Sequence, residues 1–120
     1  MERSGLAKIL IVEDEPLIAM LVQDWIADMG HETVGPAYSL EQARALLDAP
    51  LDGAIVDLTL GGESGRPIAE ALAARGAPFV YSTGRAEDQL DDLPTAACVL
   101  HKPFSYEALE AAVRAMLPPD

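Results

Sequence analysis

Five short apolar segments alternate with stretches of helical apolar spacing along this chain. The first, residues 8–12, is a continuous run of the kind that is buried on both faces of a parallel sheet. Because a helical pattern follows each apolar run, the sequence predicts an α/β fold with a doubly wound parallel sheet. The other strands are expected at 31–37, 53–57, 79–82 and 97–100.

The helices between these segments carry start and stop signals. Pro16 suits the first turn of the first helix, and Gly30 fits the cap that ends it. Ser39 followed by Gln42 is typical of a capping box. We expect two further helices, one over about 66–75 and one with Ser105 as its N-cap.

The interval 84–95 is the least regular part of the pattern. Leu90 and Leu93 give it a thin apolar face, and its Asp and Pro residues are poor helix formers. The sequence therefore predicts that the fourth helix is short or irregular.

Polar side chains gather where the predicted strands end. A flavodoxin-like sheet of five βα units has the strand order 2-1-3-4-5, and sites in such sheets lie at the carboxyl ends, between the first and third strands. We therefore expect one site to contain Glu13, Asp14, Asp57, Ser82, Thr83 and Lys102.

The mixture of charges at these positions favours a metal ion. Three carboxylates in one pocket repel one another, and the single ammonium of Lys102 leaves negative charge in excess. Mg²⁺ prefers oxygen ligands, so Glu13, Asp14 and Asp57 are candidate ligands, with the carbonyl of Thr59 beside them.

A carboxylate beside such an ion is also a nucleophile for phosphoryl transfer. Asp57 at its strand end would form an aspartyl-phosphate, whose oxygens need neutralising by a cation and by hydrogen-bond donors. Lys102 and Thr83 can supply the ammonium and the hydroxyl.

The length, composition and net charge of the chain agree with a regulatory domain. With 120 residues, half of them apolar, the chain is expected to be one domain, 1–120. The net charge of -12 argues against direct binding of nucleic acid. A single cysteine, no signal peptide and no apolar run of about 18 residues predict a cytoplasmic protein without membrane attachment.

Over essentially its whole length, the sequence resembles the receiver domain of two-component response regulators. The resemblance rests on four short motifs that occur in the family's order and spacing. These are Glu13-Asp14, Asp57, Thr83 and Lys102-Pro103-Phe104.

The resemblance implies a role for each of these residues. Asp57 would accept a phosphoryl group from the phosphohistidine of a histidine kinase or of a phosphotransfer protein. Asp14 and Asp57 would bind Mg²⁺ directly with the Thr59 carbonyl, and Glu13 would act through water. Lys102 would pair with the phosphoryl oxygens.

The resemblance also implies how the domain would switch. Thr83 would swing in to hydrogen-bond the phosphoryl group, drawing the following loop with it. The Lys102-Pro103 bond would be cis, as in the family. The family's switch aromatic usually lies three residues before the lysine, where this chain has Val99, so the usual Thr–aromatic coupling is lost. Gly61 replaces a common proline, which predicts a more flexible loop after Asp57.

The sequence Tyr81-Ser82-Thr83-Gly84 resembles a subgroup of single-domain receivers that read Phe-Ala-Thr-Gly there. This subgroup is typical of alphaproteobacteria and often occurs beside kinases of the HWE or HisKA2 type. We therefore expect a stand-alone receiver that acts through a downstream protein target, or as an intermediate or sink in a phosphorelay.

Two other functional classes compete with this interpretation. An aspartate-based phosphatase or phosphotransferase would need a second acid two residues after the nucleophile, where Thr59 stands. The chain is therefore not expected to be an enzyme, beyond catalysing its own phosphorylation and dephosphorylation. The alternative is a pseudo-receiver that is never phosphorylated and serves only as an interaction module. This interpretation stays possible because Val99 replaces the usual switch aromatic.

Overall fold

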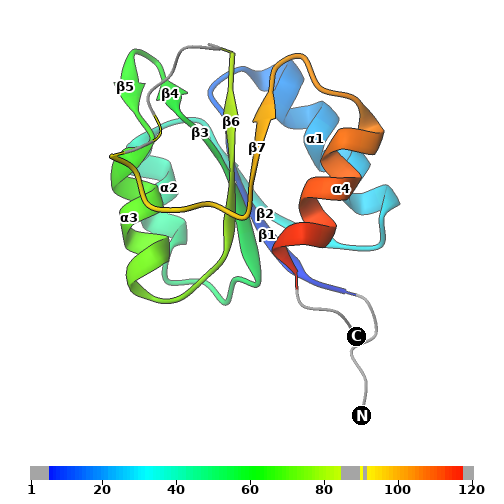
Figure 1. Cartoon of the computed structure of the whole chain (residues 1–120), viewed down its shortest axis with the longest axis horizontal. Coiled ribbons are helices and arrows are strands. Elements are labelled where there is room, and N and C mark those ends of the chain that lie inside the picture. Colours follow the sequence, from blue (N-terminus) through cyan, green and yellow to red (C-terminus); the bar gives the residue numbers. More distant parts are fainter. Residues whose placement is uncertain (1–5, 85–89, 91, 118–120) are drawn as a thin grey trace.

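A five-stranded parallel sheet forms the centre of the molecule (Figure 1). The computed structural model describes residues 6–84, 90 and 92–117. The strand order is β2-β1-β3-β6-β7, which is the predicted order 2-1-3-4-5 with two short strands, β4 and β5, outside the sheet. The sheet strands are β1 (Lys8–Val12), β2 (Glu32–Ala37), β3 (Gly53–Asp57), β6 (Phe79–Thr83) and β7 (Cys98–His101).

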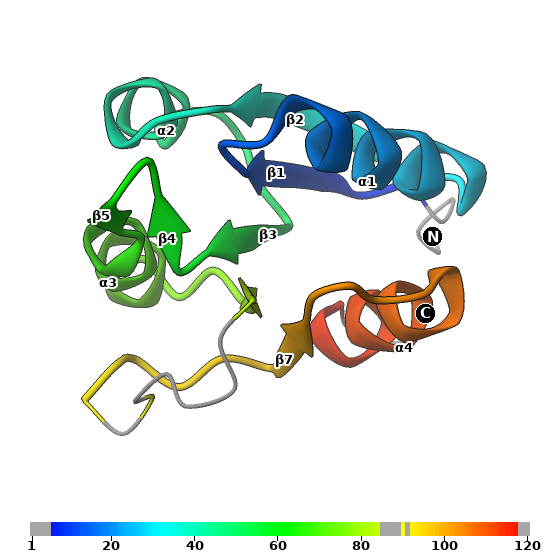
Figure 2. The ribbon, with the colours of Figure 1, turned by 90° about the horizontal axis from the view of Figure 1, so that it is seen from above.

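Helices cover both faces of this sheet, so the predicted flavodoxin-like arrangement is confirmed. Viewed from above, α1 and α4 lie together on one side of the sheet, and α2 and α3 lie together on the other (Figure 2). In the described part of the chain the helices are α1 (Pro16–Asp28), α2 (Leu40–Leu46), α3 (Arg66–Ala74) and α4 (Tyr106–Met116).

The core is divided into two clusters by the sheet, because successive side chains of a strand point to opposite faces. The α1/α4 core contains strand residues such as Ile55, Val80 and Leu100, packed against the helices on that side. The α2/α3 core contains the intervening residues, among them Val56 and Tyr81. The cluster to which a strand residue belongs therefore shows on which face of the sheet its side chain lies.

Helix caps agree with the sequence pattern, with one shift. The Ser39 hydroxyl accepts a hydrogen bond from the Gln42 amide at 3.1 Å, as a capping box requires. The Gln42 side chain, however, accepts from the amide of Tyr38, one residue earlier than expected. The Ser105 hydroxyl accepts from the Ala108 amide at 3.1 Å and caps α4.

The glycine-rich loop after Asp57 is an ordered hairpin, which the sequence did not predict. Strands β4 (Thr59–Leu60) and β5 (Glu63–Ser64) pair antiparallel. Gly61 and Gly62 between them have φ values of 56° and 89°. Positive φ at both central residues is what a two-residue hairpin turn needs, and glycine adopts it without steric cost. The loop thus has a regular hairpin conformation, and its expected flexibility stays a prediction.

The expected irregular fourth helix lies largely outside the described residues, since 85–89 and 91 are not among them. The described neighbours, 84, 90 and 92–97, contain no helix. The hydroxyl of Tyr81 donates a hydrogen bond to the carbonyl of Pro94 at 2.6 Å, which ties β6 to the segment before β7. Among the described helices, none has the length and apolar character to cross a membrane.

The backbone of Gly65 lies so close to the backbone of Asp57 that there is no room for a side chain at position 65. A Cβ atom there would lie 2.1 Å from the carbonyl oxygen of Asp57. Gly65→Ala should therefore lower the free energy of unfolding by about 2 kcal/mol or more, because the backbone at the end of β3 must shift. Urea denaturation of both proteins measures this change.

Gly84→Ala is the matched control, because a Cβ atom at Gly84 meets no atom of the described residues within 4 Å. Its effect on the free energy of unfolding should stay within about 0.5 kcal/mol. Equal effects of the two substitutions would contradict the steric argument.

Candidate functional site

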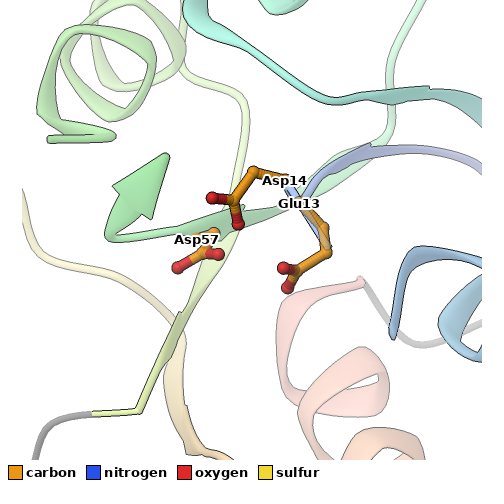
Figure 3. A group of neighbouring side chains, drawn as sticks. All are labelled: Glu13, Asp14 and Asp57. Carbon is orange, nitrogen blue, oxygen red and sulfur yellow. The ribbon is translucent and has the colours of Figure 1, made fainter. Parts of the chain in front are cut away.

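Three carboxylates from two strand ends converge at the carboxyl edge of the sheet. Glu13 and Asp14 directly follow β1, and Asp57 is the last residue of β3 (Figure 3). Each contributes a carboxylate oxygen to a group in which these atoms all lie within 4.8 Å of one another. The structure therefore brings together the acidic residues that the sequence singled out.

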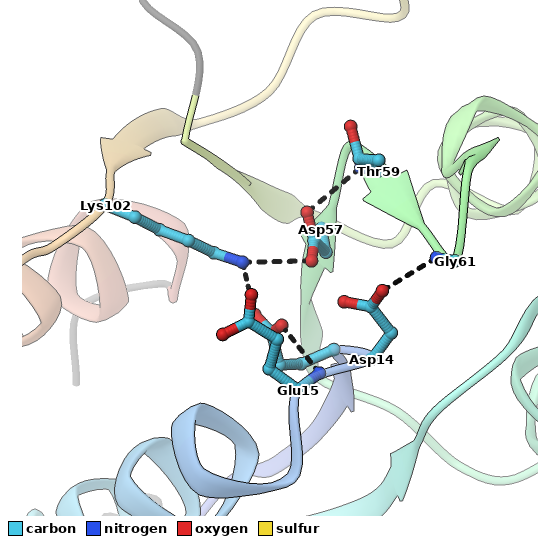
Figure 4. A network of polar contacts seen from close by, with 7 residues as sticks. Asp14, Glu15, Asp57, Thr59, Gly61 and Lys102 are labelled. Atoms are coloured by element: carbon cyan, nitrogen blue, oxygen red, sulfur yellow. Dashed lines mark hydrogen bonds and ion pairs between the residues drawn. The ribbon is translucent and has the colours of Figure 1, made fainter.

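Lys102 joins this group from the far side of β6. Its ammonium lies 2.9 Å from Glu13 Oε1 and 3.0 Å from Asp57 Oδ2 (Figure 4). The Lys102 side chain is 16% exposed, and those of its two partners are 5% and 4% exposed. The ammonium thus bridges two buried carboxylates in an environment where water screens little of the charge.

The acidity of these groups follows from their burial. Burial and the nearby charge of Asp57 raise the pKa of Glu13 to about 7, although its hydrogen bond with Lys102 opposes the rise. Burial would lower the pKa of Lys102, but its hydrogen bonds to Glu13 and Asp57 leave that pKa above the usual value. Lys102 is therefore the permanent cation of the site.

Both carboxylate oxygens of Asp57 have partners. The Thr59 amide donates to Oδ1 at 3.0 Å, in the local pattern typical of an aspartate that opens a turn. Lys102 donates to Oδ2. Asp57 is 3% exposed, so its position and orientation are fixed by these contacts.

The hairpin and the first turn after β1 hold the other two carboxylates. The Gly61 amide donates to Asp14 Oδ2 at 2.7 Å, and the Glu15 amide donates to Glu13 Oε2 at 3.1 Å (Figure 4). Sequence reasoning missed Gly61 as a partner of the site. The Gly-Gly pair was the available signal, since it is typical of a tight hairpin turn.

Thr59 and Thr83 lie at different depths. Thr59 is exposed and lines an open cavity of about 220 Å³ together with Asp14, Asp57 and Lys102. Thr83 is buried at the end of β6, where its carbonyl accepts from the Lys102 amide at 2.7 Å. The alternation along β6 places its side chain on the face of Tyr81, opposite to Asp57.

The set of donors fits a hard divalent cation. Three carboxylates and one ammonium leave an excess of negative charge, and all the available ligand atoms are oxygens. Asp14 is the most accessible of the three acids, and with Asp57 it lines the open cavity. An ion can therefore reach the group from solvent without displacing the core.

An apolar groove of about 380 Å³ borders the site along α1. Ile18, Leu21 and Phe104 line it, together with Lys102. On the same helix the side chains of Leu17 and Met20 are exposed. The carboxyl edge is thus flanked by apolar surface as well as by charge.

The lysine–carboxylate contacts make a prediction about pH. In the metal-free protein the raised pKa of Glu13 favours its protonated form. The contribution of Glu13 to the free energy of unfolding is therefore fully present below pH 4.5 and is lost as the pH rises through about 7. Glu13→Gln should abolish this loss. Relative to the wild type, the variant should gain on the order of 2 kcal/mol between pH 5 and pH 8.

Urea denaturation in the presence of a chelator, at pH 5 and pH 8, measures this gain. Glu32→Gln, on an exposed position of β2, removes the same charge at a distance from the site and is the control. A difference between Glu13→Gln and wild type that does not change with pH would contradict the prediction.

Comparison with known proteins agrees with this geometry. A family model described as "Response regulator receiver domain" matches residues 9–114. The two-component response regulator PhoP of Pseudomonas aeruginosa is 30% identical over 115 residues, which are 92% of this chain and 51% of that protein. The regulatory protein VanR of Enterococcus faecium is 34% identical, over 92% of this chain and 49% of that protein. The chain thus spans about half the length of the curated relatives it matches.

Solved structures share the fold, and two of the three described here also share the length. SdrG from Sphingomonas melonis Fr1 is 43% identical with a TM-score of 0.81, and the match covers 95% of this chain and 98% of that one. The response regulator PhyR from Brucella abortus is 29% identical with a TM-score of 0.84, over 96% of this chain and 49% of that one. TrrA from Thermotoga maritima, solved in complex with Mg²⁺ and BeF, is 25% identical with a TM-score of 0.82, over 92% of this chain and 99% of that one.

The cis Lys102–Pro103 bond, which the resemblance implied, is present as well. Sheet order, the acidic group, its lysine and the family match all lead to one conclusion. The chain belongs to the response regulator receiver domain family of two-component signalling.

Proposed function

We propose that this chain accepts a phosphoryl group on Asp57 from the phosphohistidine of a histidine kinase or phosphotransfer protein, in a Mg²⁺-dependent reaction. The observation that carries the proposal is the surroundings of Asp57. Its buried carboxylate has an ammonium at 3.0 Å and two further carboxylates whose oxygens lie within 4.8 Å. This is the arrangement that a carboxylate nucleophile for phosphoryl transfer needs.

The reaction would be a direct transfer between two side chains. An Asp57 oxygen attacks phosphorus, the bond between phosphorus and the donor imidazole nitrogen breaks, and its electron pair stays on that nitrogen. Lys102, already 3.0 Å from Asp57, neutralises charge on the transferred oxygens without having to be recruited. The proposal assigns Thr83 the role of a hydroxyl donor that must rotate toward the phosphoryl group.

The same residues would hold the metal. Asp14 and Asp57, with the Thr59 carbonyl, are proposed as direct ligands, and Glu13 as a ligand through water. When bound, Mg²⁺ supplies positive charge to the phosphoryl oxygens. The open cavity that Asp14, Asp57 and Thr59 line supports this assignment.

The route by which phosphorylation would be transmitted differs from the usual one at Val99. Val99 pairs with Tyr81 in the sheet, so the two side chains lie on the same face of neighbouring strands. The Tyr81 ring packs edge-on against Phe79 at 5.3 Å, and its hydroxyl bonds to Pro94. We propose that Tyr81, two residues before Thr83, provides the aromatic contact that Val99 lacks.

The output is proposed to be a protein partner or a further phosphotransfer step, with residues 1–120 acting as a stand-alone receiver. The near-complete mutual coverage with SdrG supports a single-domain unit. The apolar groove, which the exposed Leu21 lines, and the exposed Leu17 and Met20 of the same helix offer a surface for a protein partner.

Asp57→Asn tests the acceptor. Wild-type protein incubated with Mg²⁺ and acetyl phosphate should gain a labile phosphoryl adduct, and Asp57→Asn should gain none, because an amide oxygen is a poor nucleophile. Intact-mass spectrometry detects the adduct. No adduct on the wild type would overturn the proposal and favour the pseudo-receiver, and an adduct retained in Asp57→Asn would place the acceptor elsewhere.

Asp14→Asn tests the metal site. Loss of one anionic ligand should weaken Mg²⁺ binding about tenfold or more, which isothermal titration calorimetry measures. Asp24→Asn is the control, since Asp24 is exposed on α1 and its substitution removes the same charge. If both variants bind Mg²⁺ equally well, Asp14 is not a ligand.

A further inference from the structure

Ser82 carries a buried hydroxyl that lacks a hydrogen-bond partner among the described residues. The residue is 2% exposed, so water does not supply the missing bond freely. A buried polar group without a partner lowers the stability of the folded protein. Such a group is rare in a folded protein and needs an explanation, for example a second state of the protein in which it is bonded.

The position of Ser82 in the sheet places it beside Asp57. The two residues are register partners in neighbouring parallel strands, and Ser82 is also the register partner of Leu100 on β7. Val80, two residues earlier, lies in the α1/α4 core together with Ile55, two residues before Asp57. Because strand side chains alternate, Ser82 and Asp57 lie on the same face. Neighbouring strands are about 4.8 Å apart.

The Lys102 side chain must pass over this position. Lys102 follows β7, whereas Asp57 ends β3, and β6 lies between these two strands. The ammonium therefore reaches Asp57 across the end of β6 (Figure 4). The face on which it meets Asp57 is the one that register and strand alternation assign to Ser82. An ammonium has three N–H donors, and the bonds to Glu13 and Asp57 use two of them. The third can serve an acceptor beneath the lysine.

We propose that Ser82 is a positioning residue of the phosphorylated state, in which its hydroxyl accepts a hydrogen bond from the Lys102 ammonium. This inference rests on the proposed phosphorylation of Asp57. Once Asp57 is phosphorylated to an acyl phosphate, its carboxyl group no longer carries the full charge that holds Lys102, and the ammonium follows the charge to the phosphoryl oxygens. Ser82 then anchors the ammonium from below through a charge-assisted hydrogen bond.

Ser82→Ala separates this role from a merely structural one. It removes the hydroxyl and yields the alanine of the Phe-Ala-Thr-Gly pattern. The unphosphorylated variant should be as stable as the wild type or more stable, because no bond is lost and an unsatisfied group is removed. In contrast, the affinity for beryllium fluoride in the presence of Mg²⁺, which mimics the phosphoryl group, should fall about tenfold.

The experiment is a titration of both proteins with beryllium fluoride at saturating Mg²⁺, followed by calorimetry, with urea denaturation of the unliganded forms. Compared with Ser82→Ala, Ser82→Thr should recover most of the affinity for beryllium fluoride, whereas Ser82→Val, which matches threonine in shape, should not. In a Lys102→Met background, Ser82→Ala should have no further effect, because the hydroxyl acts through the ammonium.

Each outcome decides between the two proposals. Equal affinity of wild type and Ser82→Ala overturns the role of Ser82 and leaves phosphorylation of Asp57 standing. A marked loss of stability in unliganded Ser82→Ala also overturns it, since the hydroxyl would then have a partner before phosphorylation. A wild type that binds no beryllium fluoride and gains no adduct from acetyl phosphate overturns both.

Discussion

One partly buried ammonium sets the geometry of the whole carboxyl edge. Lys102 lies within 3.0 Å of an oxygen from Glu13 and from Asp57, and these residues come from three different strand ends. The contact is possible only if β1, β3, β6 and β7 keep their register, because one residue of slip would turn a side chain to the other face. The ion pairs therefore depend on the sheet, and without them two buried carboxylates would repel each other.

The sheet also separates the parts of the site by face. Asp57 and Ser82 lie on the side of the α1/α4 core, whereas Tyr81 belongs to the α2/α3 core. Charge is thus held on one face of β6, and the aromatic contacts lie on the other. Thr83 lies at the end of the same strand, on the face of Tyr81. Its carbonyl accepts a hydrogen bond from the Lys102 amide and so links this face to the lysine of the charged group. Strand β6 therefore contacts both Lys102, through the Thr83 carbonyl, and the segment before β7, through the Tyr81 hydroxyl.

The sequence was sufficient for features that depend on local pattern. The strands, their order and the convergence of Glu13, Asp14 and Asp57 follow from apolar runs and from where they end. The hairpin after Asp57 did not follow, because a Gly-Gly pair is compatible with a flexible loop as well as with a tight turn. The empty hydrogen-bonding capacity of Ser82 was equally out of reach, since it depends on burial and register.

The contact of Gly65 with the backbone of Asp57 limits which residue can begin α3. A Cβ atom at Gly65 would overlap the Asp57 carbonyl, so the start of α3 already touches the main chain of the candidate acceptor. A side chain at position 65 would therefore displace the end of β3, and with it the carboxylate that the Thr59 amide and Lys102 hold. A glycine outside the charged group is thus one of the residues that set the position of that group.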